Sequence, residues 1–124
     1  RAVSTTTDLG KTWKEHESSR TALQEPVCMA SLISVKAKEN VLGKDILLFS
    51  NPNDTKNRHS ITIKASLDGG VTWLPENQLL DAGWGWGYSC LTMIDKETVG
   101  ILYESSVAHM TFQAIKLKDI VKTK

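Results

Sequence analysis

The feature that most constrains the fold of this chain is an eight-residue formula that occurs twice. Residues 6–13 (TTDLGKTW) and 66–73 (SLDGGVTW) both follow the pattern [S/T]-x-D-x-G-x-T-W, and they begin 60 positions apart. In such a formula the aspartate accepts hydrogen bonds from backbone N–H groups across a turn, and the glycine supplies a positive φ. The tryptophan covers the small apolar face of a hairpin. The repeat therefore predicts two hairpins of the same construction, separated by the length of one structural unit.

The residues expected to build these two hairpins have structural roles and carry no chemistry. They are Asp8, Gly10, Trp13, Asp68, Gly70 and Trp73.

Short segments of apolar and β-branched residues, separated by turn signals, occupy most of the remaining chain. Residues 59–66 alternate cleanly, with Ile61 and Ile63 on one face and Thr62 and Lys64 on the other. A helical turn is expected only at residues 117–121. The pattern predicts an all-β fold with strands at residues 1–6, 13–17, 28–35, 45–50, 59–66, 72–79, 88–94, 98–104 and 110–117.

Composition narrows the range of functions. The formal net charge of +1 provides no basic field for nucleic acid, and no apolar run approaches the roughly 18–20 residues that span a bilayer. The N-terminus lacks the pattern of a signal peptide and begins at Arg1 inside a predicted strand, so we expect a piece of a longer protein. Cys28 and Cys90 match no zinc spacing; they are either a disulfide or reactive thiols or, as we favour, two small buried hydrophobic residues.

A second informative stretch is residues 83–91 (GWGWGYSCL), followed by the predicted strand at residues 98–104. The three alternating glycines predict a flexible approach to a strand that begins at Tyr88. Glu104 lies sixteen positions after this tyrosine. A tyrosine in that setting is a candidate for chemistry.

Several segments together resemble bacterial exo-α-sialidases over nearly the whole chain. Residues 25–31 (EPVCMAS) resemble the E-P-x-C-x-x-S segment of that family, and residues 87–91 (GYSCL) match its G-Y-S-x-L motif. Residues 49–52 (FSNP), with Arg58 before an alternating strand, resemble the segment that supplies one arginine of the sialidase triad, and residues 100–104 (GILYE) resemble the strand after the tyrosine. The two repeats resemble Asp-boxes, the peripheral hairpins of this family.

The resemblance implies part of a six-bladed β-propeller of four-stranded blades. Residues 28–79 would form one complete blade, residues 1–17 the last two strands of the preceding blade, and residues 88–117 three strands of the next. This gives a C-terminal fragment of about two and a half blades with unpaired edges. We therefore expect a partner segment, either another chain or the missing N-terminal part of the same polypeptide.

The resemblance also assigns chemistry to three side chains. Tyr88 would be the nucleophile of a retaining hydrolysis, because a neutral phenol avoids the repulsion that a carboxylate nucleophile meets at the carboxylated carbon of sialic acid. Arg58 would hold the sialic acid carboxylate through paired charged hydrogen bonds, and Glu104 would support a triad arginine. The aspartate acid/base, the glutamate that deprotonates the tyrosine and two triad arginines would lie before Arg1, so the fragment alone is expected to be inactive.

Other polar and aromatic residues receive weaker assignments. Trp84 and Trp86 are either a sugar-binding rim or loop anchors. No triad role is transferred to Arg1; Arg20 is expected to be solvated and Glu25 structural. His16, His59 and His109 are scattered, so no metal site and no cofactor is expected.

Two main functions remain open at this level, and a third, an interaction module that pairs through its exposed edge strands, applies only if the fragment is natural. The first is an exo-α-sialidase acting on sialylated glycans, and the alternative is a non-catalytic Asp-box propeller that binds carbohydrate. The joint presence of Arg58 and Tyr88 favours the enzyme. Because sialylated glycans lie outside cells, a secreted or periplasmic location is expected.

Overall fold

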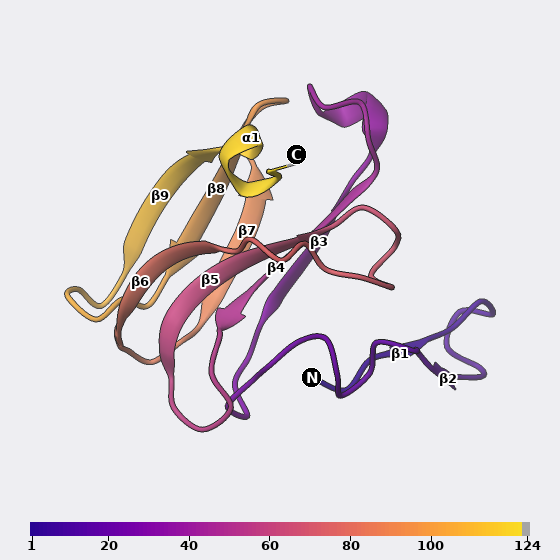
Figure 1. The fold of residues 1–124 in the computed structure, drawn as a ribbon, viewed down its shortest axis with the longest axis horizontal. Helices are drawn as coiled ribbons and strands as arrows, with labels where there is room; N and C mark the ends of the chain where they lie inside the picture. The colour runs from indigo at the N-terminus through magenta and orange to yellow at the C-terminus, as the bar shows by residue number, and fades with distance from the viewer. Residues whose placement is uncertain (123–124) are drawn as a thin grey trace.

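The computed structural model describes residues 1–122 and consists of three antiparallel sheets (Figure 1). A two-stranded hairpin near the N-terminus is followed by a four-stranded sheet in the order β3-β4-β5-β6 and a three-stranded sheet in the order β7-β8-β9. The strands are β1 (Ser4–Thr5), β2 (Lys14–Glu15), β3 (Ser31–Val35), β4 (Ile46–Pro52), β5 (His59–Ser66), β6 (Gln78–Trp84), β7 (Ser89–Met93), β8 (Thr98–Tyr103) and β9 (Thr111–Lys116). Two short helices, η1 (Ala37–Glu39) and α1 (Leu117–Ile120), complete the described elements. The all-β prediction, the grouping of strands and the helical turn are confirmed.

One predicted strand was misplaced. The fourth strand of the central sheet runs over Gln78–Trp84 and not over residues 72–79. Leu74 still donates its N–H to the Ala65 carbonyl at 2.8 Å, but Pro75 has no N–H to continue the ladder. Pairing with β5 resumes between Gln78 and Ile63 and includes two register shifts. Consequently Gly83 and Trp84 belong to a strand, and the expected flexible approach begins later and is shorter.

The hydrophobic core lies between the two larger sheets. Apolar residues of β4, β5, β7 and β8 meet there, and α1 adds Leu117 and Ile120, both almost fully buried. The two faces of β5 are as predicted, but its polar face is buried as well, with Lys64 only 4% exposed. Burial lowers the pKa of this lysine. The central strand is therefore covered on both sides.

A polar seam joins the two larger sheets. The hydroxyls of Ser50 in β4 and Ser89 in β7 are 2.8 Å apart and buried, and Ser89 also lies 3.3 Å from the Ser50 carbonyl oxygen. In β3, the Ser31 hydroxyl accepts the N–H of Leu91 at 3.0 Å. Buried hydroxyls need such partners, so these contacts fix β7 against the first two strands of the neighbouring sheet.

The two copies of the repeated formula form nearly identical turns. In the second copy, both N–H and hydroxyl of Thr72 donate to the Asp68 carboxylate, at 2.9 and 2.5 Å. The Ser66 hydroxyl accepts the Gly70 N–H at 2.9 Å. The first copy repeats this geometry around Asp8, with its threonine N–H at 2.9 Å. The predicted hairpin chemistry is therefore present in both copies.

The tryptophans of the two turns differ in their surroundings. Trp73 packs edge-on against Phe49, with ring centroids 5.8 Å apart. Trp13 is 64% exposed and donates its indole N–H to the Gly10 carbonyl at 3.0 Å. Only the second tryptophan covers an apolar surface, because the first hairpin projects away from the two larger sheets (Figure 1).

Hydrogen bonds from Thr72 and Ser66 lower the pKa of Asp68 from 3.8 to about 2. Stability linked to this carboxylate is therefore fully present above its unfolded pKa and is lost as the pH falls through about 2. In the full-length protein that carries this segment, Asp68→Asn should lower the melting temperature at pH 6, and the loss should shrink toward pH 3. Thermal unfolding across this pH range measures the effect.

Glu17→Gln is the matched control, since it removes an exposed carboxylate from the first hairpin region. A pH-independent difference between Asp68→Asn and the wild type would contradict a role for the charge of this carboxylate.

Candidate functional site

Tyr88 and Glu104 extend the ladder between β7 and β8 by one further residue pair. The Tyr88 N–H donates to the Glu104 carboxylate at 3.0 Å, and the Glu104 N–H donates to the Tyr88 carbonyl at the same distance. The Tyr88 side chain is 47% exposed. The glutamate thus fixes the backbone of the tyrosine while the tyrosine ring remains accessible.

Arg58 reaches this tyrosine from the loop between β4 and β5. Its guanidinium carbon lies 5.7 Å from the centre of the Tyr88 ring, within the range of a cation–π contact. Its Nη1 donates to the Trp86 carbonyl at 3.0 Å, and its own carbonyl accepts the Gly85 N–H at 2.9 Å. Two hydrogen bonds therefore tie Arg58 to the segment that leads into Tyr88.

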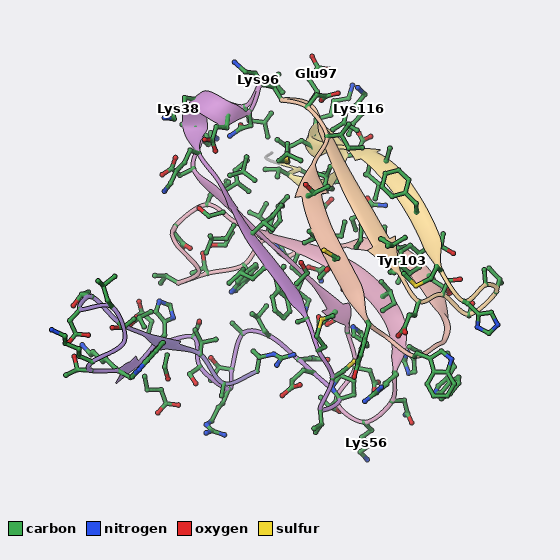
Figure 2. The ribbon with its side chains drawn as sticks, turned by 180° about the vertical axis from the view of Figure 1, so that it is seen from behind. Lys38, Lys56, Lys96, Glu97, Tyr103 and Lys116 are labelled. Atoms are coloured by element: carbon green, nitrogen blue, oxygen red, sulfur yellow. The ribbon has the colours of Figure 1, made fainter. Side chains whose placement is uncertain are left out.

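The loop before Arg58 is ordered by Asp54. Its carboxylate accepts the N–H groups of Lys56 and Asn57, both at 2.6 Å, and these bonds lower its pKa. Lys56 lies at the end of the sheets opposite to Lys38 and Lys96 (Figure 2). Arg58 follows two residues later, so the candidate site lies at the end of the sheets that Lys56 marks.

Cys28 packs beneath the segment that leads into Tyr88. Its sulfur lies 3.5 Å from the Gly87 carbonyl oxygen and 3.9 Å from that of Trp86. Burial raises the pKa of the Cys28 thiol, so the neutral S–H is the form that donates. Gly87 has a φ of +89°, and a side chain there would begin 2.8 Å from Pro52 and 3.1 Å from Cys28. Only glycine fits this position without displacement.

A small hollow of about 190 Å³ opens beside the tyrosine. Tyr88 and Glu104 line it together with Met29, Ser89, Cys90, Leu102 and Met110. A larger hollow of about 440 Å³, between the first hairpin and the central sheet, includes Arg1, Leu32, Phe49 and Trp73 and does not include Tyr88 or Arg58.

The predicted site residues fall into two groups. The structure brings together Arg58, Tyr88, Glu104 and Trp86, while Trp84 lies next to Trp86 with ring centroids 5.9 Å apart. In the described chain Glu104 forms no ion pair with an arginine, so its support of a triad arginine stays a prediction.

Arg1 and Glu25 meet at Cys28, which packs beneath the segment that leads into Tyr88, whereas Arg20 lies with the first hairpin. Arg1 pairs with Glu25 at 3.5 Å and also contacts the Cys28 carbonyl, while Glu25 accepts the Cys28 N–H at 3.2 Å. Arg20 is exposed and lies 3.4 Å from Glu15. These contacts agree with the predictions that Glu25 has a structural role and that Arg20 is solvated.

The cysteine prediction was half wrong. Cys28 is buried, but Cys90 is exposed, and both are free thiols. Successive residues of a strand face opposite sides. Since Ser89 and Leu91 point inward in β7, Cys90 between them points outward.

No group of three or more His, Cys, Asp or Glu side chains within residues 1–122 is placed to hold a metal ion. None of the helices in the described part of the chain is long and apolar enough to cross a membrane.

Sequence reasoning missed three supporting residues. Ser50 and Ser89 join the sheets directly behind Tyr88, and Asp81 ties β6 to the loop after Glu104 through Ser106 at 2.7 Å. A serine after the tyrosine was visible in the motif, but nothing in the sequence indicated its partner 39 residues away.

Comparison with known proteins supports the family predicted from the motifs. The chain is 79% identical to a sialidase of Bacteroides fragilis (strain YCH46) over 123 residues, which are 98% of this chain and 23% of that protein. It superposes on the structure of the Hadza microbial sialidase Hz136 with a TM-score of 0.94 at 74% identity, covering 97% of this chain and 23% of that one. No family model matches.

A more distant structure shares the fold. The intramolecular trans-sialidase of Ruminococcus gnavus, solved with oseltamivir carboxylate, matches 98% of this chain and 29% of its own at 22% identity and a TM-score of 0.71. The chain belongs to the bacterial sialidases, a class of glycoside hydrolases, as one segment of such a protein. It spans about a quarter of the length of the relatives that it matches.

The crowding around Gly87 leads to a testable expectation. In the full-length protein, Gly87→Ala should lower the melting temperature, because the new methyl group would begin 2.8 Å from Pro52 and 3.1 Å from Cys28. Thermal unfolding measures the effect.

Gly43→Ala is the matched control. Gly43 also has a positive φ, of +62°, but a side chain there would meet nothing within 4 Å. Both variants therefore carry similar backbone strain, of about 1–2 kcal/mol, and Gly87→Ala should lose clearly more stability than Gly43→Ala. Equal losses in the two variants would contradict the role given to packing against Cys28 and Pro52.

Proposed function

We propose that the protein carrying this segment is an exo-α-sialidase that releases terminal α-linked sialic acid from glycoconjugates with retention of configuration. The observation that carries the proposal is the position of the Arg58 guanidinium 5.7 Å from the Tyr88 ring, in a chain 79% identical to a sialidase. Sialic acid carries its carboxylate on the carbon that is attacked. A group that binds this carboxylate must therefore lie close to the nucleophile, as Arg58 lies close to Tyr88.

In this proposal Arg58 positions the sugar. A guanidinium binds a carboxylate through two parallel charged hydrogen bonds, and the bond from Arg58 to the Trp86 carbonyl fixes the direction from which it does so. Because the same segment continues into Tyr88, the group that binds the substrate and the group that attacks it share one support. Such shared support favours a near-attack geometry.

Tyr88 then acts as the nucleophile. Its phenolic oxygen attacks the anomeric carbon, the glycosidic bond breaks, and the departing oxygen takes a proton from a general acid. Water later cleaves the tyrosyl–sugar bond and restores the phenol. The base that accepts the tyrosine proton and the general acid belong, in this proposal, to parts of the protein outside this segment.

The role proposed for Glu104 is to hold a second arginine of the carboxylate site. One of its oxygens accepts the Tyr88 N–H, and a carboxylate has further lone pairs for a guanidinium. We propose that this arginine also comes from the rest of the protein. Glu104 would then connect the backbone of the nucleophile with the carboxylate site.

The architecture that completes the site is, in this proposal, a six-bladed β-propeller in which the segment supplies about two and a half blades near the C-terminus. The four-stranded sheet fits one blade, and the contact of β7 with β3 and β4 fits the meeting of inner strands from adjacent blades. The two repeat turns would be Asp-boxes at its periphery. Substrates would be sialylated glycoproteins, glycolipids and oligosaccharides, and a secreted or periplasmic location would bring the enzyme to them.

Tyr88→Phe in the full-length protein should abolish hydrolysis with retention while leaving the melting temperature nearly unchanged, because the removed hydroxyl belongs to a half-exposed side chain. Turnover of a fluorogenic sialoside and NMR of the first anomer released measure the effect.

Tyr103→Phe is the control. Tyr103 ends β8 in the same sheet, and its buried hydroxyl accepts a hydrogen bond from Gln113 at 2.8 Å. This change should alter stability and leave turnover in place. Near-normal activity of Tyr88→Phe would show that the nucleophile has been misassigned, and sialoside binding without turnover by the wild type would favour a carbohydrate-binding propeller.

The 124-residue segment by itself should not hydrolyse a fluorogenic sialoside, since it supplies 23% of the length of its relatives and, by the assignment above, lacks the acid and the base. Assay of the purified segment beside the full-length protein tests this. Robust turnover by the segment would refute the division of catalytic groups proposed here.

A further inference from the structure

The peptide group between Gly87 and Tyr88 is held at both of its ends. Its N–H, that of Tyr88, donates to the Glu104 carboxylate at 3.0 Å. Its carbonyl oxygen, that of Gly87, lies 3.5 Å from the Cys28 sulfur in a buried position. The N–H and C=O of a trans peptide point in opposite directions within one rigid plane. The carboxylate and the thiol therefore hold the same plane from opposite sides.

This peptide plane needs to be held because glycine precedes it. The plane turns through the ψ of Gly87 and the φ of Tyr88, and glycine places few limits on its own backbone angles. Gly87 already has a φ of +89°. The φ of Tyr88 also helps to set the direction of its side chain, whose ring lies 5.7 Å from the Arg58 guanidinium. A plane that turns would redirect the phenol relative to the arginine.

The backbone of Cys28 is itself held by a charged pair. The Glu25 carboxylate accepts the Cys28 N–H at 3.2 Å, and the Arg1 guanidinium contacts the Cys28 carbonyl. Arg1 and Glu25 pair with each other at 3.5 Å. Burial raises the pKa of the thiol and outweighs the opposite effect of the nearby arginines, so the neutral S–H is the donor. This thiol thus meets Gly87 from a fixed support.

The residue before Cys28 carries backbone strain. Val27 has a φ of +55°, in a region that β-branched residues rarely adopt. Its side chain is 87% exposed, so packing of this side chain does not explain the conformation. Strain of this kind persists where the surrounding contacts over-determine the backbone. Here the contacts of Glu25 and Arg1 with Cys28 do so, and they leave the thiol beside Gly87.

A small apolar side chain would not replace this cysteine. Within residues 1–122, the thiol is the one donor that the Gly87 carbonyl meets. The carbonyl of Trp86, one residue earlier, has Arg58 as its donor at 3.0 Å. Buried carbonyl groups need such partners. An alanine at position 28 would therefore leave the Gly87 carbonyl without a donor and its peptide plane held at one end only.

We propose that Cys28 is a positioning residue for Tyr88, whose thiol fixes the peptide plane before the nucleophile and with it the direction from which the phenol attacks. The proposal rests on the sialidase function proposed above. In this role Cys28 does not touch the substrate and acts through Gly87. Glu25 and Arg1 act one step further back, through Cys28.

The test uses the full-length protein and a fluorogenic sialoside, with kcat expressed per folded protein. Cys28→Ala removes the donor and should lower kcat about tenfold, because a misdirected nucleophile reacts slowly. KM should change less than about twofold, since Arg58 still binds the sugar carboxylate. Cys28→Ser keeps an O–H donor at the same place and should retain at least about a third of the wild-type kcat.

Glu25→Gln is a second variant that leaves the buried thiol in place. Glu25 is partly exposed, and glutamine has the same size, so this change spares the packing around Cys28. It removes the charge that pairs with Arg1 and should lower kcat about threefold, again with KM nearly unchanged. An unchanged kcat in Glu25→Gln would refute the part given to the charged pair.

Val35→Ala is the matched control for stability, since Val35 is buried in the core at the far end of β3. It should lower the melting temperature at least as much as Cys28→Ala and leave kcat in place. A wild-type kcat in Cys28→Ala, a Cys28→Ser no faster than Cys28→Ala, or an equal loss in Val35→Ala would each overturn the positioning role. A wild-type protein that does not hydrolyse the sialoside would refute the sialidase function itself.

Discussion

The hydroxyl contact between Ser50 and Ser89 is the interaction on which the arrangement of the site depends. These two side chains join the inner strands of separate sheets at 2.8 Å, in a place that water does not reach. Tyr88 directly precedes Ser89, and the loop that carries Arg58 begins just after β4, the strand that carries Ser50. The contact that joins the sheets therefore acts together with the hydrogen bonds of Arg58 to Trp86 and Gly85 in fixing the arginine relative to the tyrosine.

Around this seam, each sheet contributes a different constraint. The central sheet supplies the loop whose Asp54 turn delivers Arg58, and Cys28 closes the space beneath Gly87. The three-stranded sheet supplies Glu104, whose carboxylate binds the backbone of Tyr88. Neither sheet contains the site alone. A shift of one sheet against the other would separate the cation from the phenol without breaking any strand.

Much of the fold and of the candidate site was predictable from local sequence patterns. The repeated formula predicted both turns because its hydrogen bonds join residues within the same eight positions, and the alternation in residues 59–66 predicted which side chains share a face. The motifs around Arg58 and Tyr88 predicted the residues that meet, and the comparisons support the family they indicated.

The predictions that failed concern features that depend on residues distant in the sequence or on a single proline. Pro75 delayed the start of β6, and the orientation of Cys90 followed from a register that the sequence pattern left open. The seam itself joins residues 39 positions apart, so no local pattern contained it.

The alternating glycines before Tyr88 have a consequence for how such a protein diversifies. Odd-numbered positions 83, 85 and 87 are held to a single residue type by the backbone and side chains that press against them. The side chains at positions 84 and 86 are more than half exposed and are under no such restriction. Substitutions at the even positions can therefore accumulate without disturbing the position of Tyr88 beside them. A library randomised at those two positions alone would vary the surface beside Tyr88 at little risk to folding.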